Sequence, residues 1–277
     1  MPATTEWAES LRRWAIPEEF TRRTAETPWV LPRQMFARRA DALIAEPSGA
    51  TFTEARAALT EPGTVLDVGV AAGATSLPLA GRAPVEHVTG VDTDAELLSA
   101  FERRAAALGV PCRVVRGTWP RVAGQAEVAD VVVCGNVVYN VADVEPFVRA
   151  LAAHARRRVV VELAAAHPLT ELNELWWRFH RLRRPDGPTA EDFLRVLEQL
   201  GIRAEVTRWR RPARAEYATA GELVDVTRRR LCLPPERAGD VEAALAGLGV
   251  DPAMPPDLGS SGRDLVTVSW AGSSRDR

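Results

Sequence analysis

The chain has 277 residues, of which 46% are hydrophobic, and a formal net charge of −2 at pH 7. This size allows one large domain with a buried core and a modest extension, and the charge gives no general attraction to nucleic acid or an anionic membrane. No apolar run is long enough to cross a bilayer, and the first residues lack the pattern of a secretory signal. We therefore expect a cytoplasmic protein.

All 35 basic residues are arginine, which excludes chemistry that needs lysine. The P-loop lysine and every Schiff-base mechanism, including that of pyridoxal phosphate enzymes, are thereby removed. The three cysteines, Cys112, Cys134 and Cys232, are widely spaced and predict neither a disulfide framework nor a metal site.

Helices interrupted by prolines are predicted for residues 1–60, and alternating strands and helices follow. Strands are predicted at 64–68, 87–91, 113–116, 128–134, 158–163, 204–209 and 264–270. Helices are predicted at 73–79, 94–108, 143–155, 170–183 and 189–200, with a largely helical insert at about 217–248. The final few residues are expected to be disordered.

This alternation predicts an α/β fold with a doubly wound, mainly parallel, seven-stranded sheet. Residues 1–60 would form a helical lid or extension, and residues 61–277 the catalytic domain. The last two strands could pair antiparallel at one edge, because an insert separates them in place of a simple crossover. Ligands of such sheets bind at the carboxyl ends of the strands, so the turns there are the candidate site.

The first of these turns reads DVGVAAG at residues 67–73. It is a poor dinucleotide fingerprint, because alanine replaces two of the glycines and Asp67 would repel a pyrophosphate. It resembles the first motif of the class I S-adenosylmethionine-dependent methyltransferases, with Ala71 in place of the middle glycine. The resemblance implies S-adenosylmethionine as the cofactor, with contacts from Asp67, Gly69, Ala71 and Gly73; its positive charges suit the Asp67 carboxylate.

The next two strand ends extend the resemblance. Asp92 lies 23 positions beyond Gly69, where a carboxylate can accept both hydroxyls of a ribose, and Thr93 follows it. Nicotinamide-binding folds share this acid. In the family the third turn holds the adenine, which assigns Thr118 and Trp119 to the cofactor site, although Trp119 could instead pack in the core.

The fourth turn faces the substrate in this family, which assigns Asn136 to both cofactor and substrate and Tyr139 to the substrate. The Pro-Pro-aromatic and Pro-Cys motifs of nucleobase methyltransferases do not occur here. His167 follows the fifth strand and has an ordinary pKa suited to accepting a proton. His167 and Tyr139 are the candidate catalytic residues.

Two further segments could line a substrate cleft. The aromatic residues of the N-terminal helices, Trp14 among them, would cover the substrate. Trp177 and His180 lie on a mixed polar and aromatic stripe of the predicted helix 170–183, which could equally be an exposed face.

These features predict methyl transfer from S-adenosylmethionine to an oxygen, nitrogen or carbon of a small molecule, by a monomer or homodimer without nucleic-acid or membrane partners. Three alternatives stay open at this point. They are a protein of the same fold that binds the cofactor without transferring a methyl group, a nicotinamide-dependent oxidoreductase, and an RNA or protein methyltransferase.

Overall fold

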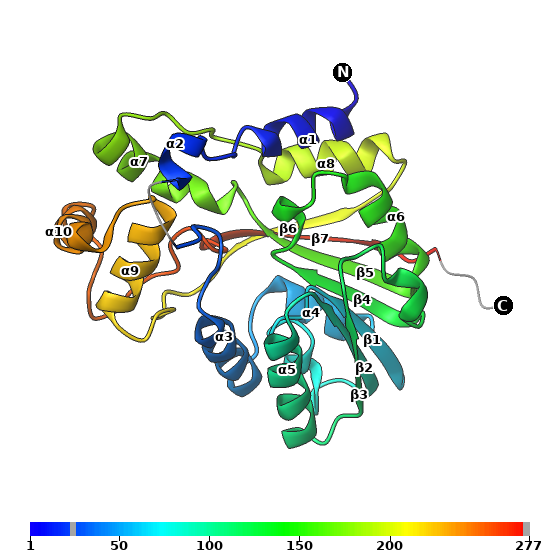
Figure 1. Cartoon of the computed structure of the whole chain (residues 1–277). Helices are drawn as coiled ribbons and strands as arrows, with labels where there is room; N and C mark the ends of the chain where they lie inside the picture. The colour runs from blue at the N-terminus through cyan, green and yellow to red at the C-terminus, as the bar shows by residue number, and fades with distance from the viewer. Residues whose placement is uncertain (23–25, 274–277) are drawn as a thin grey trace.

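A computed structural model describes residues 1–22 and 26–273 of the chain, so the expectation for the final few residues lies almost wholly outside it. Within this part, seven strands form one sheet in the order β3-β2-β1-β4-β5-β7-β6 (Figure 1). The strands are β1 (Gly63–Val68), β2 (Val85–Asp92), β3 (Cys112–Arg116), β4 (Ala129–Gly135), β5 (Ala155–Ala164), β6 (Glu205–Arg210) and β7 (Asp264–Ala271). Only β7 runs against its neighbours, pairing antiparallel with β5 and β6. The predicted α/β sheet and its antiparallel edge are confirmed.

The helices lie before and between these strands. They are α1 (Ala3–Arg12), α2 (Glu18–Thr21), α3 (Arg33–Ala45), α4 (Ala50–Ala57), α5 (Ala95–Ala107), α6 (Val144–Ala153), α7 (Asn173–His180), α8 (Ala190–Gln199), α9 (Ala220–Arg230) and α10 (Ala238–Gly247). The last two form the helical insert before β7. No helix in the described part of the chain is long and apolar enough to span a membrane.

Two predicted helices differ from the structure. The segment 73–79 is a series of turns that ends in a three-residue 3-10 helix, Leu77–Leu79. Gly73 has a φ of 95°, outside the helical region, and Pro78 has no N–H to donate, so an α-helix cannot form there. The helix predicted at 170–183 is also shorter, because Arg181 adopts a left-handed φ of 55° and ends α7.

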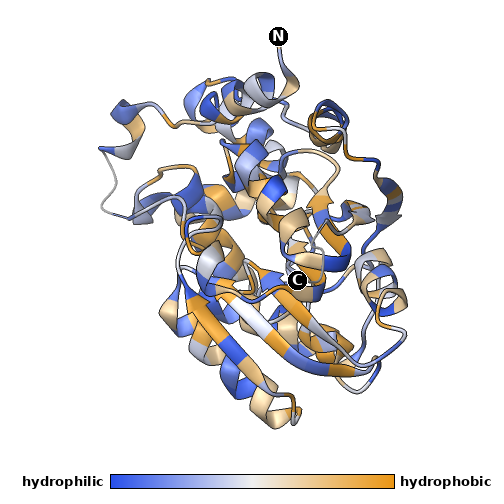
Figure 2. Ribbon diagram, turned by 90° about the vertical axis from the view of Figure 1, so that its right-hand side faces the viewer, coloured by the Kyte–Doolittle hydropathy of each residue, from blue (hydrophilic) through white to orange (hydrophobic). Residues whose placement is uncertain are grey.

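The core is divided into three apolar clusters. One joins α1, α6 and α8 to one face of the sheet, and a second joins α4 and α5 to the opposite face. A third packs α3 and α7 against the insert helices. Figure 2 shows hydrophobic stretches along the strands and mixed hydropathy along the helices, as expected of a sheet covered on both faces.

The sheet order reverses between β1 and β4. β1 pairs with β2 on one side and with β4 on the other, all in parallel, so the carboxyl ends of these strands meet at one edge. β5 continues this parallel set beside β4. The turns that follow these four strands are therefore brought together at the point where doubly wound sheets bind ligands.

Candidate functional site

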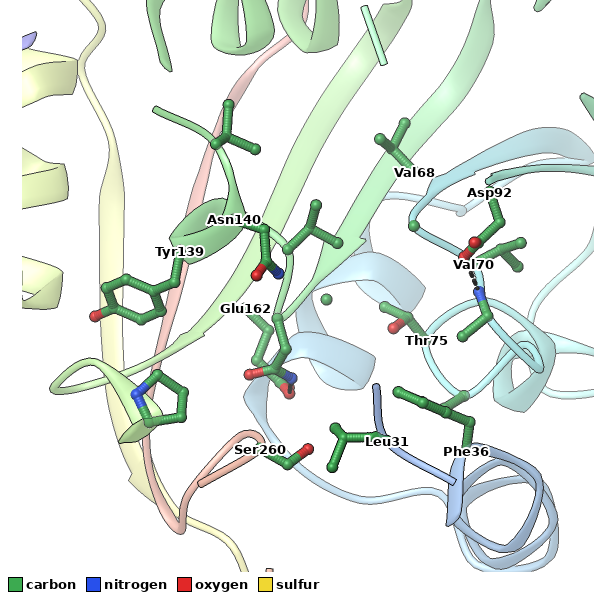
Figure 3. A pocket seen from close by; sticks show the side chains of 18 of the residues that line it. Leu31, Phe36, Val68, Val70, Thr75, Asp92, Tyr139, Asn140, Glu162 and Ser260 are labelled. Carbon is green, nitrogen blue, oxygen red and sulfur yellow. Dashed lines mark hydrogen bonds between the residues drawn. The ribbon is translucent and has the colours of Figure 1, made fainter. Parts of the chain in front are cut away.

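A cavity of about 950 Å³ lies at this edge of the sheet (Figure 3). Residues from the N-terminal segment, among them Trp14, Trp29 and Phe36, form part of its wall. The cavity brings together most of the residues that the sequence predicts for the site. Those in its wall are Trp14, Gly69, Ala71, Asp92, Thr93, Thr118, Trp119, Asn136, Tyr139 and His167.

The turn after β1 approaches the cavity with backbone that favours glycine. Gly69 and Gly73 have φ values of 78° and 95°, and Ala71 between them has a φ of 45°. A Cβ on Gly69 would lie 2.2 Å from a methyl carbon of Val137, so no larger residue fits without displacing that side chain. The left-handed conformation of Ala71 costs roughly 1–2 kcal/mol, and such strain is concentrated at functional sites.

Asp92 ends β2 with its carboxylate in the cavity wall. One oxygen accepts the N–H of Ala71 at 2.9 Å (Figure 3). The other accepts the N–H of Asp94 at 3.0 Å. The carboxylate thus links the first turn to the start of α5. Because each carboxylate oxygen can accept more than one hydrogen bond, Asp92 retains capacity for a ligand's hydroxyl groups.

Asn136 follows β4 and is held by β5. Its φ is 59°, its backbone N–H donates to the carbonyl of Glu162 at 2.8 Å, and its Nδ2 donates to Glu162 Oε1 at 2.8 Å. Its Oδ1 is buried and has no hydrogen-bond partner among the described residues. An unused acceptor of this kind in a cavity wall is costly unless a ligand or water satisfies it.

Glu162 is a central residue of the cavity wall that the sequence did not predict. Its carboxylate lines the cavity from β5 and accepts hydrogen bonds from Thr51 at 2.8 Å and from Arg211 at 2.9 Å, in addition to Asn136. In Figure 3 its side chain projects into the centre of the view. The sequence does contain a signal for it: Glu162 is a single acid within the otherwise apolar end of a buried strand. Acidic residues are rarely buried unless they are paired, so an acid at such a position indicates a specific partner or ligand.

Buried charges continue from Glu162 towards the N-terminal helices. Arg211 also lies 3.9 Å from Asp257, which pairs with Arg39 of α3 at 3.0 Å. Arg39 pairs in turn with Glu216, at 3.1 Å. Burial alone lowers the pKa of Arg39, but Asp257 and Glu216 outweigh it and raise that pKa. This ionic network ties α3 and the loop before β7 to the sheet.

Thr118 and Trp119 follow β3 on the Asp92 side of the cavity. Trp119 lines the cavity, but it is only 6% exposed and its indole N–H donates to the carbonyl of Phe147 at 3.4 Å. Its ring meets that of His154 edge-on. Most of the Trp119 ring therefore packs in the core, and part of it lines the cavity; its contact with a cofactor stays a prediction.

His167 and Tyr139 line the cavity beside Trp14, but both already have protein partners. The His167 ring stacks on Trp14 with 4.3 Å between ring centres, and its Nδ1 accepts the N–H of Leu169. The Tyr139 hydroxyl donates to the carbonyl of Ala164 at 2.7 Å, and burial raises its pKa above the ordinary value.

Burial, with repulsion from Arg230 and Arg184, lowers the pKa of His167 to about 4. His167 is therefore neutral at pH 7 and a weak proton acceptor.

The low pKa of His167 predicts a stability effect. Between pH 4 and the ordinary value of 6.5 the unfolded chain binds more protons at His167 than the folded chain. Its contribution to the free energy of unfolding should therefore fall as the pH drops through this window, by up to about 1.4 kcal/mol per pH unit. His167→Asn, which keeps an acceptor for Leu169, should lose this dependence in urea unfolding at pH 5 and 7. Equal pH dependence in both proteins would contradict the assignment.

Four predicted residues lie outside the cavity wall. Asp67 is fully buried behind the first turn. Burial raises its pKa to about 7, and the nearby charge of Asp92 adds to the rise, while hydrogen bonding with Ser76 opposes it. Gly73 shapes the turn, because a Cβ there would lie 2.5 Å from Leu77. The sequence pattern locates the turn but cannot show that these two residues face away from the ligand.

The other two residues outside the wall belong to α7. Trp177 is 42% exposed, with the Arg183 guanidinium 5.0 Å from its ring centre. The Nε2 of His180 donates to the carbonyl of Leu231 at 2.6 Å. The stripe that contains them is therefore a surface and an interhelical contact, because α7 turns its other face to the core.

Residues 65–158 match a family model described as "Methyltransferase domain". Over this segment the chain is similar to that methyltransferase domain family. The matched segment runs from β1 to β5 and contains the first turn, Asp92, Trp119 and Asn136. A comparison with curated protein sequences gave no significant match.

Two solved structures are similar to the chain. The YcgJ protein from Bacillus subtilis is 16% identical, with a TM-score of 0.51 over 81% of this chain and 99% of its own. The magnesium protoporphyrin IX methyltransferase ChlM from Synechocystis PCC 6803, solved with bound SAH, is 15% identical, with a TM-score of 0.49 over 87% of this chain and 84% of its own.

The residues present fit the cofactor of this family. The first turn offers close backbone approach, Asp92 has free acceptor capacity, and the Asn136 Oδ1 lacks a partner in the described structure. Among the described residues, Asp92 accepts hydrogen bonds from two backbone N–H groups and is not neutralised by a cationic side chain. A site with this charge suits a nucleoside that carries hydroxyls and positive charge better than one that carries phosphates.

Proposed function

We propose that the chain transfers the methyl group of S-adenosylmethionine to a small organic molecule bound in the same cavity. The proposal rests on one observation: a single cavity is lined by two different regions of the chain. The turn 69–73 and Asp92 form one part of its wall, and aromatic residues of the N-terminal segment form another. A cavity of about 950 Å³ falls in the range typical of small-molecule sites and must hold both ligands, which favours a small acceptor.

The roles of the chain's own residues follow from their places in the wall. Asp92 would accept the ribose hydroxyls, Thr118 and Trp119 would contact the adenine, and the backbone of Gly69 and Ala71 would approach the methionine end. When bound, the cofactor supplies a methyl group already activated on a sulfonium. The protein therefore has to supply alignment and the exclusion of water, which the cover formed by the N-terminal helices provides.

General base catalysis by His167 or Tyr139 is not part of this proposal. A histidine with a pKa of about 4 is a weak acceptor at neutral pH, and the Tyr139 hydroxyl is committed to a backbone carbonyl. Glu162 is ion-paired with Arg211 and accepts hydrogen bonds from Asn136 and Thr51, so it positions these side chains. These residues would shape the acceptor's surroundings, and the acceptor's own nucleophile would attack the methyl group in line.

The alternatives are less well supported. A nicotinamide dinucleotide would bring its pyrophosphate to a first turn backed by the buried Asp67, which disfavours phosphate. A nucleic-acid or protein substrate would have to reach a cavity covered by Trp14, Trp29 and Phe36. The cytoplasmic location and the monomeric or dimeric state stay predictions.

The proposal is tested by identifying what the purified protein binds and transfers. Denaturation followed by mass spectrometry should detect co-purified S-adenosylmethionine or S-adenosylhomocysteine, and calorimetry should show binding of the latter. Incubation with radiolabelled S-adenosylmethionine and fractionated small-molecule extracts should then label an acceptor. Binding without labelling in any fraction would favour a non-catalytic protein, and binding of NADH in place of the nucleoside would favour an oxidoreductase.

A further inference from the structure

Some of the arginines that face the acceptor part of the cavity are neutralised by acidic partners, and one is not. Arg211 and Arg39 line the cavity but are neutralised by Glu162, Asp257 and Glu216 in the ionic network described above. A third cation, Arg230 at the end of α9, also belongs to the wall. It forms no ion pair or hydrogen bond within the described chain.

Arg230 is deeply placed. Its residue is 9% exposed, its Nε is buried without a partner in the described structure, and burial lowers its pKa. Its Nη1 would lie 3.5 Å from a Cβ built on Gly259. Its positive charge also helps to lower the pKa of His167. The charge of Asp257 attracts Arg230 at longer range. One carboxylate oxygen of Asp257, however, already accepts hydrogen bonds from Arg39 and Ser261.

An unpaired buried guanidinium is costly, because its loss of hydration is not repaid by a counter-charge. The neighbouring arginines of α9 have such partners: Arg228 pairs with Asp225 and Glu26, and Arg229 pairs with Asp225. Arg230 therefore differs from its neighbours in facing the cavity with its positive charge unused.

We propose that Arg230 binds a carboxylate on the methyl acceptor, so that the substrate is a small carboxylic acid whose flat apolar body lies against Trp14 and His167. This inference rests on the proposed function and names the substrate class of the same site. A guanidinium presents paired N–H donors that match a carboxylate in bidentate fashion. The acid binds through Arg230 while the nucleophile on its body points towards the first turn.

The position of Arg230 separates this subsite from the cofactor residues. In Figure 3 Ser260, which follows Gly259 in the chain, lies on the opposite side of the view from Asp92. Arg12 also lines the cavity but is exposed, so Arg230 is the buried cation of the wall that lacks a counter-charge among the described residues. A single positive charge fits a carboxylate better than a doubly charged phosphate ester. The nearby Arg184 does not line this cavity, and its terminal nitrogens already donate to the carbonyls of Trp14 and Ala15, so it does not offer a second cationic contact to a ligand there.

The test compares matched acids and amides on protein saturated with S-adenosylhomocysteine. The pairs are 4-hydroxybenzoate with 4-hydroxybenzamide, salicylate with salicylamide, and indole-3-acetate with indole-3-acetamide, titrated by calorimetry. At least one acid should bind roughly tenfold or more tightly than its amide, as charge-assisted hydrogen bonds predict. Arg230→Met should abolish that preference, and the matched control Arg229→Met on the same helix should retain it.

Folding is checked separately from binding. Arg230→Met removes an unpaired buried charge, so its melting temperature should equal or exceed that of the original protein; a lower melting temperature would assign Arg230 a structural role and overturn the proposal. A panel in which no acid exceeds its amide would also overturn it, as would tighter binding of phenyl phosphate than of benzoate. If Arg230→Met instead weakened S-adenosylhomocysteine itself, Arg230 would belong to the cofactor site. Failure of the original protein to bind S-adenosylhomocysteine would contradict the proposed function, a result distinct from all of these.

Discussion

Replacement of Asp92 by alanine is expected to raise the dissociation constant of S-adenosylhomocysteine at least about tenfold. Hydrogen bonds to a charged group are worth roughly 1.5–3 kcal/mol, which corresponds to about ten- to hundredfold in affinity. The variant also loses the bonds that hold the N–H groups of Ala71 and Asp94, so the first turn should become less ordered. Isothermal titration calorimetry of the folded variant measures the effect.

Two further variants make this result specific. Asp92→Asn keeps the size of the side chain and one acceptor oxygen, so it should bind more weakly than the original protein and more tightly than Asp92→Ala. Glu86→Gln changes an exposed acid near the other end of β2 and should leave the dissociation constant unchanged. An Asp92→Ala protein that binds as the original does would remove Asp92 from the cofactor site.

The second large effect is expected at Glu162. Glu162→Gln removes the counter-charge of Arg211 in a buried setting, where the two side chains are 12% and 9% exposed. Breaking a buried ion pair by removing one partner typically costs about 3–5 kcal/mol, because the remaining charge is left uncompensated. Asp257, at 3.9 Å from Arg211, should reduce the cost towards the lower end of that range. Urea unfolding at pH 7 gives the change in the free energy of unfolding.

The double variant Glu162→Gln/Arg211→Met provides the diagnostic comparison. It removes the orphaned cation as well, so it should be more stable than Glu162→Gln alone. As a surface control, Arg149→Met breaks an exposed pair with Glu145 on α6 and should cost less than about 1 kcal/mol. A Glu162→Gln protein as stable as this control would show that the ionic network contributes little to folding.

Much of the fold and the cofactor half of the site could be predicted from local sequence. Strands such as β4 are short apolar runs with defined ends, and their alternation with helices determines a parallel sheet. The turn 67–73 and Asp92 follow strand ends, so their positions in the chain place them at the same edge. The helix predicted at 73–79 was wrong because Gly73 and Pro78 outweigh the apolar pattern around them.

Other parts of the site depend on side chains that only the folded chain brings together. Glu162 lies on β5, Arg39 on α3 and Arg211 directly after β6, and no spacing in the sequence relates them. The low pKa of His167 arises from burial and two distant arginines, and neither cause is visible locally.

The sequence by itself determined the order of the strands and helices and the chemistry of the strand-end turns, because hydrophobic periodicity and turn-forming residues act over a few neighbours. The tertiary structure alone decided which side chains face the cavity. Asp67 and Trp119 have equally suggestive positions in the chain, yet the first is sealed behind the turn and the second reaches the cavity wall. Burial and ion pairing are properties of surfaces packed together across long sequence separations, and those surfaces exist only in the folded chain.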